Sequence, residues 1–203
     1  MNIIQIFSTP IWESPYPDFI EHKDQFIFCV KEFRNANPEG IKKSNINGYQ
    51  SPMTLTKEIA VASLFEYISQ MAQKAMFDMQ FVNCDVYITA AWVNFNESRN
   101  QYNCEHIHQD TFSGVFYLQI PENSGKIYFV NQGLNPLWQG AMLTDKKNKF
   151  NADRLRIEPK EGQLFLWPSY LSHAVEPNNH DETRISISFN VICVPKEYVE
   201  HTK

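Results

Sequence analysis

The strongest constraint on the fold is an alternating run late in the chain, RISISFNV at 184–191. Its apolar and polar side chains occupy alternate positions: Ile185, Ile187, Phe189 and Val191 against Ser186, Ser188 and Asn190. Because successive side chains of a strand point to opposite faces, this run predicts a β-strand with one buried face and one polar face.

Short β-branched and aromatic runs separated by turn residues fill the chain from Cys84 onward. We predict strands at Asp85–Phe95, Ser113–Ile120, Lys126–Val130, Arg154–Glu158, Gln163–Trp167 and Arg184–Val194. Before them, helical spacing predicts helices at Asp18–Asn35 and Thr56–Phe77, and the segment 42–52 between these is expected to be an ordered loop. Ile3–Trp12, which contains Pro10, predicts an edge strand.

Many short strands after two helices favour an α+β fold. We expect a double-stranded β-helix, or jelly roll, with the N-terminal helices packed on one sheet. The 203 residues are 43% hydrophobic and contain no linker or repeat, so a single domain over 1–203 is predicted.

Composition limits the cellular location and the binding partners that we expect for this protein. The net charge of −5 and the lack of a basic run give no reason to expect nucleic acid as a partner. No stretch approaches the roughly 20 apolar residues that cross a bilayer, so we expect no membrane association and a cytoplasmic location. The four cysteines are scattered without a Cys-Xaa-Xaa-Cys pair, which predicts free thiols.

A candidate metal site consists of His108, Asp110 and the distant His173. On an extended chain, positions 108 and 110 point to the same side, and a late strand of a jelly roll can bring His173 beside them. Two histidines and one carboxylate leave open positions on a non-haem iron. The alternative interpretation is a surface turn in which Asp110 and His108 make local hydrogen bonds.

Arg184 opens the alternating strand and is the second candidate site residue. A guanidinium on an inward position needs a carboxylate partner, and no acidic residue within the strand supplies one. Either a ligand carboxylate fills that role, or Arg184 pairs with Asp181 or Glu182 at the strand entrance.

Several segments carry a resemblance that spans nearly the whole chain: IFSTPIW, SNINGYQS, QYNCEHIHQD, TFSGVFYLQIPENSGKIYFVN, EPKEGQLFLWPSYLSHAVEPN and DETRISISFNV. Together they resemble the small, prolyl-hydroxylase-like 2-oxoglutarate- and iron(II)-dependent oxygenases of bacteria and phages. The resemblance is specific for fold and cofactor and says little about the substrate.

The resemblance implies an oxidoreductase, a dioxygenase that hydroxylates a second substrate of unknown identity while 2-oxoglutarate is converted to succinate and carbon dioxide. His108, Asp110 and His173 would bind iron(II), and no catalytic residue is expected beyond the metal ligands. Arg184 would hold the distal carboxylate of 2-oxoglutarate, with Ser186, Tyr117 and Asn94 as further contacts. Dioxygen is the other partner, ascorbate is a further cofactor that the family allows, and we leave a homodimer open.

The chain departs from its relatives around the first ligands. Many relatives read His-Xaa-His-Pro, whereas this chain reads His106-Ile107-His108-Gln109-Asp110 with a slightly shorter spacing to Ser113. Two triads are therefore open: His108, Asp110 and His173, or His106, His108 and His173 with Asp110 orienting a ligand. We favour the first because iron oxygenases most often use two histidines and one carboxylate.

Two other classes of function remain as alternatives. One is a jelly-roll binding module with a vestigial metal site, and the other is a cupin-like metal isomerase. Arg184 separates them from the oxygenase, since neither needs a buried cation one strand beyond the distal histidine.

Overall fold

The computed structural model describes residues 8–133, 148 and 151–196. Its helices are α1 (Phe19–Ala36) and α2 (Ala62–Asp78), with the short 3₁₀ turns η1 (Leu55–Lys57) and η2 (Ile59–Val61) before α2. Its strands are β1 (Trp12–Pro15), β2 (Asn45–Ile46), β3 (Tyr49–Gln50), β4 (Cys84–Asn96), β5 (Tyr102–His106), β6 (Phe112–Gln119), β7 (Ile127–Val130), β8 (Arg154–Ile157), β9 (Gln163–Pro168), β10 (His173–Val175) and β11 (Arg184–Pro195).

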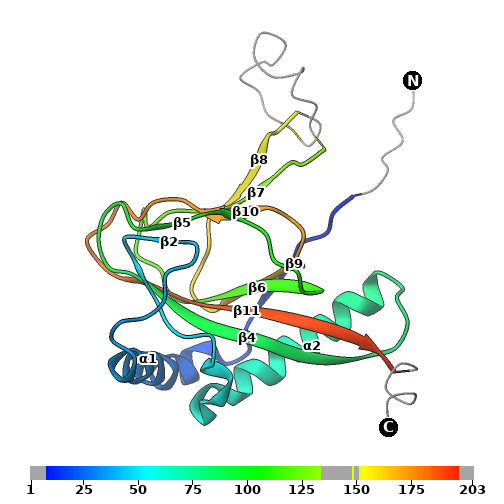
Figure 1. The fold of residues 1–203 in the computed structure, drawn as a ribbon, viewed down its shortest axis with the longest axis horizontal. Coiled ribbons are helices and arrows are strands. Elements are labelled where there is room, and N and C mark those ends of the chain that lie inside the picture. Colours follow the sequence, from blue (N-terminus) through cyan, green and yellow to red (C-terminus); the bar gives the residue numbers. More distant parts are fainter. Residues whose placement is uncertain (1–7, 134–147, 149–150, 197–203) are drawn as a thin grey trace.

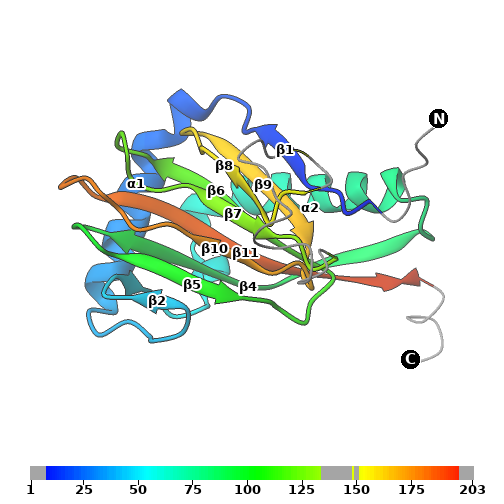
Figure 2. The same cartoon turned by 90° about the horizontal axis from the view of Figure 1, so that it is seen from above.

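Two antiparallel sheets face one another, as Figure 1 shows. The larger has the order β1-β9-β6-β11-β4-β3 and the smaller β2-β5-β10-β7-β8. Both helices run along the outer face of the larger sheet, below it in Figure 1, and Figure 2 shows the strands of the two sheets layered over one another. The described residues are therefore mostly β-structure with two helices, arranged in three layers.

The alternation of β11 divides its side chains between two environments. Its apolar residues, such as Ile187, join the core cluster between the larger sheet and the helices, whereas Arg184, Ser186 and Ser188 line a pocket between the two sheets. The polar face of this strand is thus directed at an internal pocket rather than at solvent. Asn190 on the same face is also buried, at 6% exposure.

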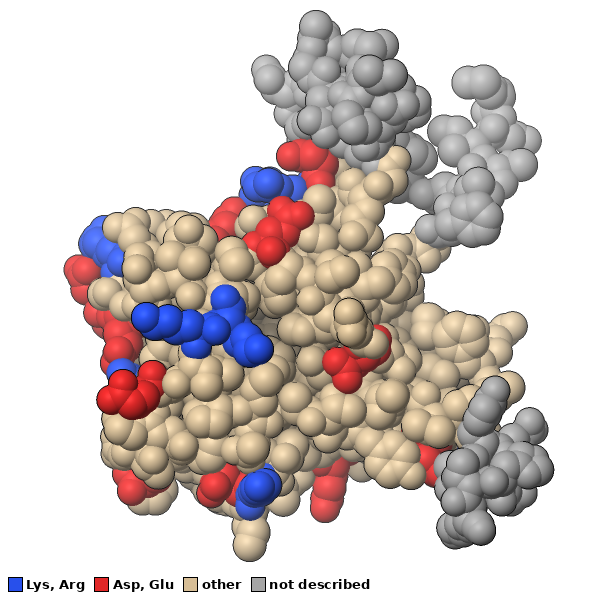
Figure 3. Space-filling view, in the orientation of Figure 1, with Lys and Arg blue, Asp and Glu red and all other residues tan. Residues whose placement is uncertain are grey.

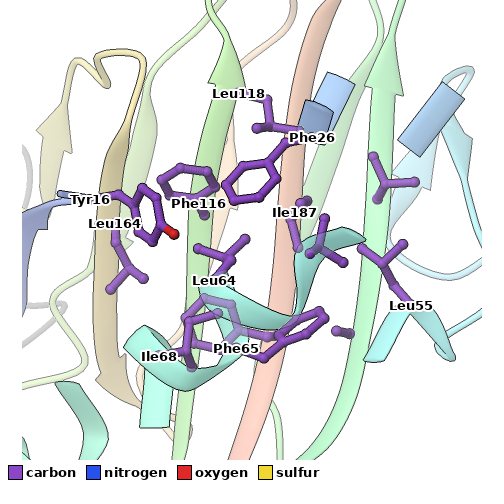
Figure 4. Packing of buried hydrophobic residues seen from close by; sticks show 14 of the residues in the cluster. Tyr16, Phe26, Leu55, Leu64, Phe65, Ile68, Phe116, Leu118, Leu164 and Ile187 are labelled. Carbon is purple, nitrogen blue, oxygen red and sulfur yellow. The ribbon is translucent and has the colours of Figure 1, made fainter. Parts of the chain in front are cut away.

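The main core lies between the helices and the larger sheet. Figure 4 shows Phe26 of α1 beside Phe116 of β6, with Leu64 and Ile68 of α2 lying nearby. The rings of Phe26 and Phe116 are 6.4 Å apart in a T-shaped arrangement, and all four side chains are fully buried. Each such side chain contributes roughly 1.5–3 kcal/mol through burial, so this layer stabilises the packing of the helices on the larger sheet.

The predicted strands from Asp85 onward, helix α1 and the end of α2 are confirmed within one or two residues, but the predicted start of α2 is wrong. The predicted start at Thr56 falls in η1, and α2 begins only at Ala62. Glu58 adopts an extended conformation (φ −84°, ψ 112°) that interrupts the helical turns, and the side chain of Ile59 is 90% exposed.

Five other elements differ from expectation. An edge strand was predicted at Ile3–Trp12, but the observed edge strand, β1, begins only at Trp12. Residues 1–7 of the predicted range lie outside the described part of the chain. The segment 42–52 contains the short strands β2 and β3, which pair with different sheets. Strands β5 and β10 were not predicted because neither has an apolar alternation.

Candidate metal and co-substrate site

Strands β5 and β10 place three histidines at one end of the space between the sheets. His173 on β10 is directly opposite His106, the last residue of β5. His108 follows two residues later, where its backbone N–H donates to the carbonyl oxygen of Ser169 at 3.0 Å. Paired strands and one backbone hydrogen bond therefore fix the positions of all three rings.

The three imidazoles form a compact cluster. Each offers one ring nitrogen that lies within 4.8 Å of the others. The ring centroids are 4.9 Å apart for His106 and His108, 4.5 Å for His106 and His173, and 5.4 Å for His108 and His173. Imidazole nitrogen is a good ligand for iron and other first-row metals, so this donor set fits such an ion.

Backbone carbonyls orient two of the rings. The Nδ1 atom of His106 is 2.7 Å from the carbonyl oxygen of Cys104, and Nδ1 of His173 is 2.9 Å from that of Leu171. Because a carbonyl oxygen can only accept, each Nδ1 carries the proton and each Nε2 keeps its lone pair. Both rings are therefore in the tautomer that binds a metal through Nε2.

Burial keeps the cluster uncharged. Desolvation lowers the pKa of His106, lowers that of His108 to about 4 and lowers that of His173 to about 3. Repulsion from neighbouring histidines adds to the effect at His108 and His173. Neutral imidazole is the form that binds metal, so the site is ready for an ion at neutral pH.

Asp110 lies outside this cluster. One of its carboxylate oxygens accepts a hydrogen bond from the Thr89 hydroxyl at 2.7 Å. Strand β5 ends at His106, and the chain from 109 to 111 bends rather than remaining extended. The alternation that would direct positions 108 and 110 to the same side is therefore interrupted, and His106 stands beside His108 instead.

Arg184 lies on the same pocket as the histidines and is 1% exposed. Its guanidinium donates to the carbonyl oxygen of Ser124 at 2.6 Å and to Oδ1 of Asn96 at 3.0 Å. Among the described residues no carboxylate pairs with it, and Asp181 pairs with Arg99 instead. Burial lowers the pKa of Arg184 to about 10, so it remains a cation at neutral pH, with no counter-charge from the described residues.

The pocket also contains buried polar atoms with no hydrogen-bond partner in the described part of the chain. These are the Tyr117 hydroxyl, Oδ1 of Asn94 and Nε1 of Trp167. Burial raises the pKa of Tyr117, so its hydroxyl stays protonated and able to donate. Buried polar atoms are normally paired, and unpaired ones in a pocket mark where a polar ligand fits.

The remaining pocket residues divide into predicted and missed ones. Ser186 lines the pocket, while its contact with 2-oxoglutarate stays a prediction, and the Asn94 amide nitrogen donates to the Ser188 hydroxyl at 3.0 Å. Trp167 was not predicted as a site residue. Its signal was present in the sequence, since FLWPSYLSH places this tryptophan on the strand that leads to His173.

Acidification should destabilise the metal-free protein through His173. The pKa of His173 is about 6.5 in the unfolded chain and about 3 in the folded protein, so the unfolded state takes up a proton at this residue first as the pH falls. Stability is therefore lost as the pH falls, by about 2 kcal/mol between pH 7 and pH 5 from this histidine. Urea unfolding at both values measures the change.

The matched variant is His173→Gln, which cannot be protonated. Its unfolding free energy should fall by about 2 kcal/mol less than that of the wild type over the same pH interval. Equal pH dependence in the two proteins would mean that His173 is freely protonated in the folded state.

The fold is shared with several solved enzymes, among them an epimerase described as non-haem and α-ketoglutarate-dependent and two prolyl hydroxylases. The epimerase SnoN from nogalamycin biosynthesis matches with a TM-score of 0.66 and 13% identity, over 91% of this chain and 76% of its own. A prolyl-4-hydroxylase from Pseudomonas putida matches with a TM-score of 0.61 and 14% identity, over 90% and 93%. The viral collagen prolyl hydroxylase of Paramecium bursaria Chlorella virus-1 gives 0.58 and 14%, over 89% and 94%.

A family model identifies the chemistry that this fold carries here. Residues 90–190 match the family described as "Putative 2OG-Fe(II) oxygenase". That range contains the three histidines, Arg184 and Tyr117. A comparison with curated protein sequences gives no match. The chain belongs to the 2OG-Fe(II) oxygenases, a family of dioxygenases that use iron(II) and 2-oxoglutarate.

Proposed function

We propose that the protein hydroxylates a C–H bond of a second substrate, with His106, His108 and His173 as the iron ligands and Arg184 as the anchor of 2-oxoglutarate. The observation that carries the proposal is that one pocket contains both a set of metal ligands and a buried cation. Three imidazoles that can bind a metal line this pocket together with the buried guanidinium of Arg184, which has no carboxylate partner among the described residues.

The metal would supply the place where dioxygen is reduced as 2-oxoglutarate is decarboxylated; overall, 2-oxoglutarate, dioxygen and R–H give succinate, carbon dioxide and R–OH. The protein residues bind, orient and exclude water. The three histidines supply the lone pairs, and the pocket walls include Trp92 and Trp167, which are 5% and 2% exposed. Such walls keep bulk water from a reactive centre.

The co-substrate end of the pocket offers donors that match a dicarboxylate. Arg184 presents a charged fork suited to a carboxylate, and the Tyr117 hydroxyl lines the same pocket. We propose that these two groups bind the distal carboxylate with Ser186. Asn94 and Trp167, each with an unpaired polar atom, are proposed to contact the rest of the molecule.

We propose His106 rather than Asp110 as the third ligand, and two variants separate them. His106→Ala should lower the affinity for iron(II) by at least about 100-fold, because it removes one of three lone pairs. Asp110→Asn should change the iron(II) affinity by less than about 10-fold from that of the wild type, because this carboxylate accepts a hydrogen bond from the Thr89 hydroxyl and lies outside the cluster. Anaerobic titration, followed by a chromophoric chelator, measures both.

The reverse ranking would restore the ligand set of His108, Asp110 and His173. Equal and complete loss in both variants would indicate that the chain segment as a whole is disturbed. Circular dichroism and the thermal midpoint of each variant, measured first, identify that case.

The identity of the second substrate is open, and the structures that share this fold include an epimerase as well as hydroxylases. We propose hydroxylation, with succinate release assayed against peptides, free amino acids and nucleosides. A product whose mass equals that of the substrate would assign the chain to isomerisation instead. The family match already favours an enzyme over the binding module.

The wider setting is part of the same proposal. We propose that residues 1–203 form one jelly-roll domain and that the protein is cytoplasmic. We also propose that it forms a homodimer, because apolar side chains such as Tyr87 and Ile192, opposite one another on β4 and β11, are exposed. Among the described residues, no helix is both long and apolar enough to cross a membrane. Acidic and basic side chains are interspersed on the face in Figure 3, which gives a nucleic acid little to bind there.

A further inference from the structure

A chain of buried polar side chains lies behind His108. The Ser169 and Ser113 hydroxyls are 2.8 Å apart, and Ser113 donates to Oδ1 of Asn190 at 3.0 Å. The amide nitrogen of Asn190 is in turn 3.4 Å from Nδ1 of His108. Ser113 and Ser169 are 1% exposed and Asn190 is 6% exposed, so water has little access to this chain.

Asn190 differs from the partners of the other two histidines. His106 and His173 face backbone carbonyls, which can only accept a hydrogen bond. Asn190 faces His108 with its amide nitrogen, which can only donate. The Nδ1 atom of His108 therefore accepts, and the proton of this neutral ring lies on Nε2. His108 alone is in the tautomer whose Nε2 has no lone pair for a metal.

The polar chain can run in the opposite direction without losing a hydrogen bond between its members. If the amide of Asn190 rotates by half a turn, its oxygen accepts from Nδ1–H of His108 and its nitrogen donates to the Ser113 hydroxyl. That hydroxyl can then donate to Ser169, since a serine hydroxyl both donates and accepts. The reversed direction leaves a lone pair on Nε2 of His108.

We propose that Asn190 is a positioning residue that sets the tautomer of His108 and reverses its amide when metal binds. The inference rests on the proposed function insofar as His108 is a metal ligand. One proton leaves Nε2 and one is taken up at Nδ1 from solvent, so the ring stays neutral. Ser113 and Ser169 rotate with it, which couples metal binding to a buried network on β6 and the residue after β9.

Nitrogen-15 NMR of histidine-labelled protein tests the tautomers directly. In the metal-free wild type, His106 and His173 should carry the proton on Nδ1 and His108 on Nε2. Adding Zn(II), a diamagnetic probe, should move the His108 proton to Nδ1 and leave the other two unchanged. A metal-free His108 that already carries its proton on Nδ1 overturns the inference.

Two substitutions at Asn190 give an independent readout. Asn190→Asp presents only acceptors, so His108 should carry its proton on Nδ1 even without metal, and Zn(II) affinity should equal or exceed that of the wild type. Asn190→Leu removes the partner, and Zn(II) affinity should fall about 10- to 100-fold. A merely structural asparagine would lose affinity in both variants, which would overturn the proposal.

Asn103→Asp is the matched control for added charge. Asn103 also lines the pocket and is 8% exposed, but its amide nitrogen donates to the Ser44 hydroxyl at 3.2 Å rather than to a histidine ring. This variant should leave the tautomer of metal-free His108 as in the wild type. A shift equal to that of Asn190→Asp would assign the effect to charge alone and overturn the role of Asn190.

The same experiments separate this inference from the metal site itself. A wild type in which Zn(II) perturbs none of the three histidines contradicts the proposed ligands, whatever the tautomer of His108. A wild type that binds Zn(II) through all three, with the His108 proton on Nδ1 throughout, keeps the ligands and contradicts only the reversal of Asn190.

Discussion

Replacing His173 by alanine is expected to lower the affinity for iron(II) by at least about 100-fold and to abolish succinate formation. His173 is the most buried of the three histidines, at 5% exposure, and is held between strands β5 and β7. Two imidazoles alone leave too few protein ligands to keep an iron ion in place. Anaerobic titration with iron(II), with and without 2-oxoglutarate, measures the loss.

The fold should survive this change with a limited loss of stability. The ring of His173 packs 4.7 Å from that of Trp167, so its removal leaves a small cavity and costs about 1–3 kcal/mol. Against this cost, His173→Ala no longer buries an ionisable ring, which helps at acid pH. A cooperative unfolding transition in urea would show that lost metal binding is not lost folding.

His180→Ala is the matched control, because His180 lies on the loop before β11 and its Nδ1 accepts from the backbone N–H of Glu182. It should bind iron(II) as the wild type does. Stoichiometric iron binding with turnover in His173→Ala would contradict the ligand assignment and leave the three-histidine cluster without the proposed role.

The strands that position the site could be predicted where one face is apolar. The run that became β11 alternates without a break, so the strand and its division into one apolar and one polar face followed directly from the sequence. Its pairing partners and the pocket that its polar face lines are seen only in the structure. Strand β5 could not be found in this way. Its residues Tyr102–His106 are mostly polar, and they form a strand because β2 and β10 pair with it from both sides.

The same limit explains why the sequence favoured Asp110 over His106 as the third metal ligand. The expectation assumed that the chain stays extended from 108 to 110, which local sequence cannot decide. A backbone hydrogen bond from Thr111 to the carbonyl oxygen of Val191, far along the chain, helps to hold the bend there. His106 thereby joins the cluster, which was the alternative that the spacing had left open.

Contacts between distant segments also account for the missed residues. Asn190 meets His108 across 82 positions, and Ser113 meets Ser169 across 56. Neither pair has a sequence signature, since serine and asparagine on a strand read only as its polar face. Pairing of β11 with β6 turns these residues into a buried network, and only the fold reveals it.

Arg184→Met is expected to raise the concentration of 2-oxoglutarate required for half-maximal activity by about 100-fold, with iron(II) affinity unchanged. Removing one partner of a buried charge pair costs roughly 3 kcal/mol, which corresponds to that factor. Methionine fills similar volume without charge or donors. Initial rates of succinate formation measure the change, and Arg184→Lys should fall between the two because lysine keeps the charge but loses the fork.

Co-substrate choice gives a sharper test than affinity alone. The wild type should prefer 2-oxoglutarate strongly over 2-oxobutyrate, a 2-oxo acid that lacks the distal carboxylate. In Arg184→Met this preference should shrink by about the same 100-fold, because the group that recognises the carboxylate is gone. Arg99→Met, which removes a 62% exposed arginine paired with Asp181, is the control and should keep the wild-type preference.

The stability of Arg184→Met bears on why this cation is present. Desolvation by burial lowers its pKa to about 10, so the pocket holds this charge at a cost to folding. Methionine removes that cost but leaves the Ser124 carbonyl and Asn96 Oδ1 without the donor they have in the wild type. The unfolding free energy should therefore change by only about 1–2 kcal/mol. If instead the variant unfolds at room temperature while 2-oxoglutarate preference in Arg184→Lys is unaltered, Arg184 serves the fold, and the co-substrate anchor must be another residue. A near-neutral change in stability with the loss of preference would mean that the charge is kept for the ligand.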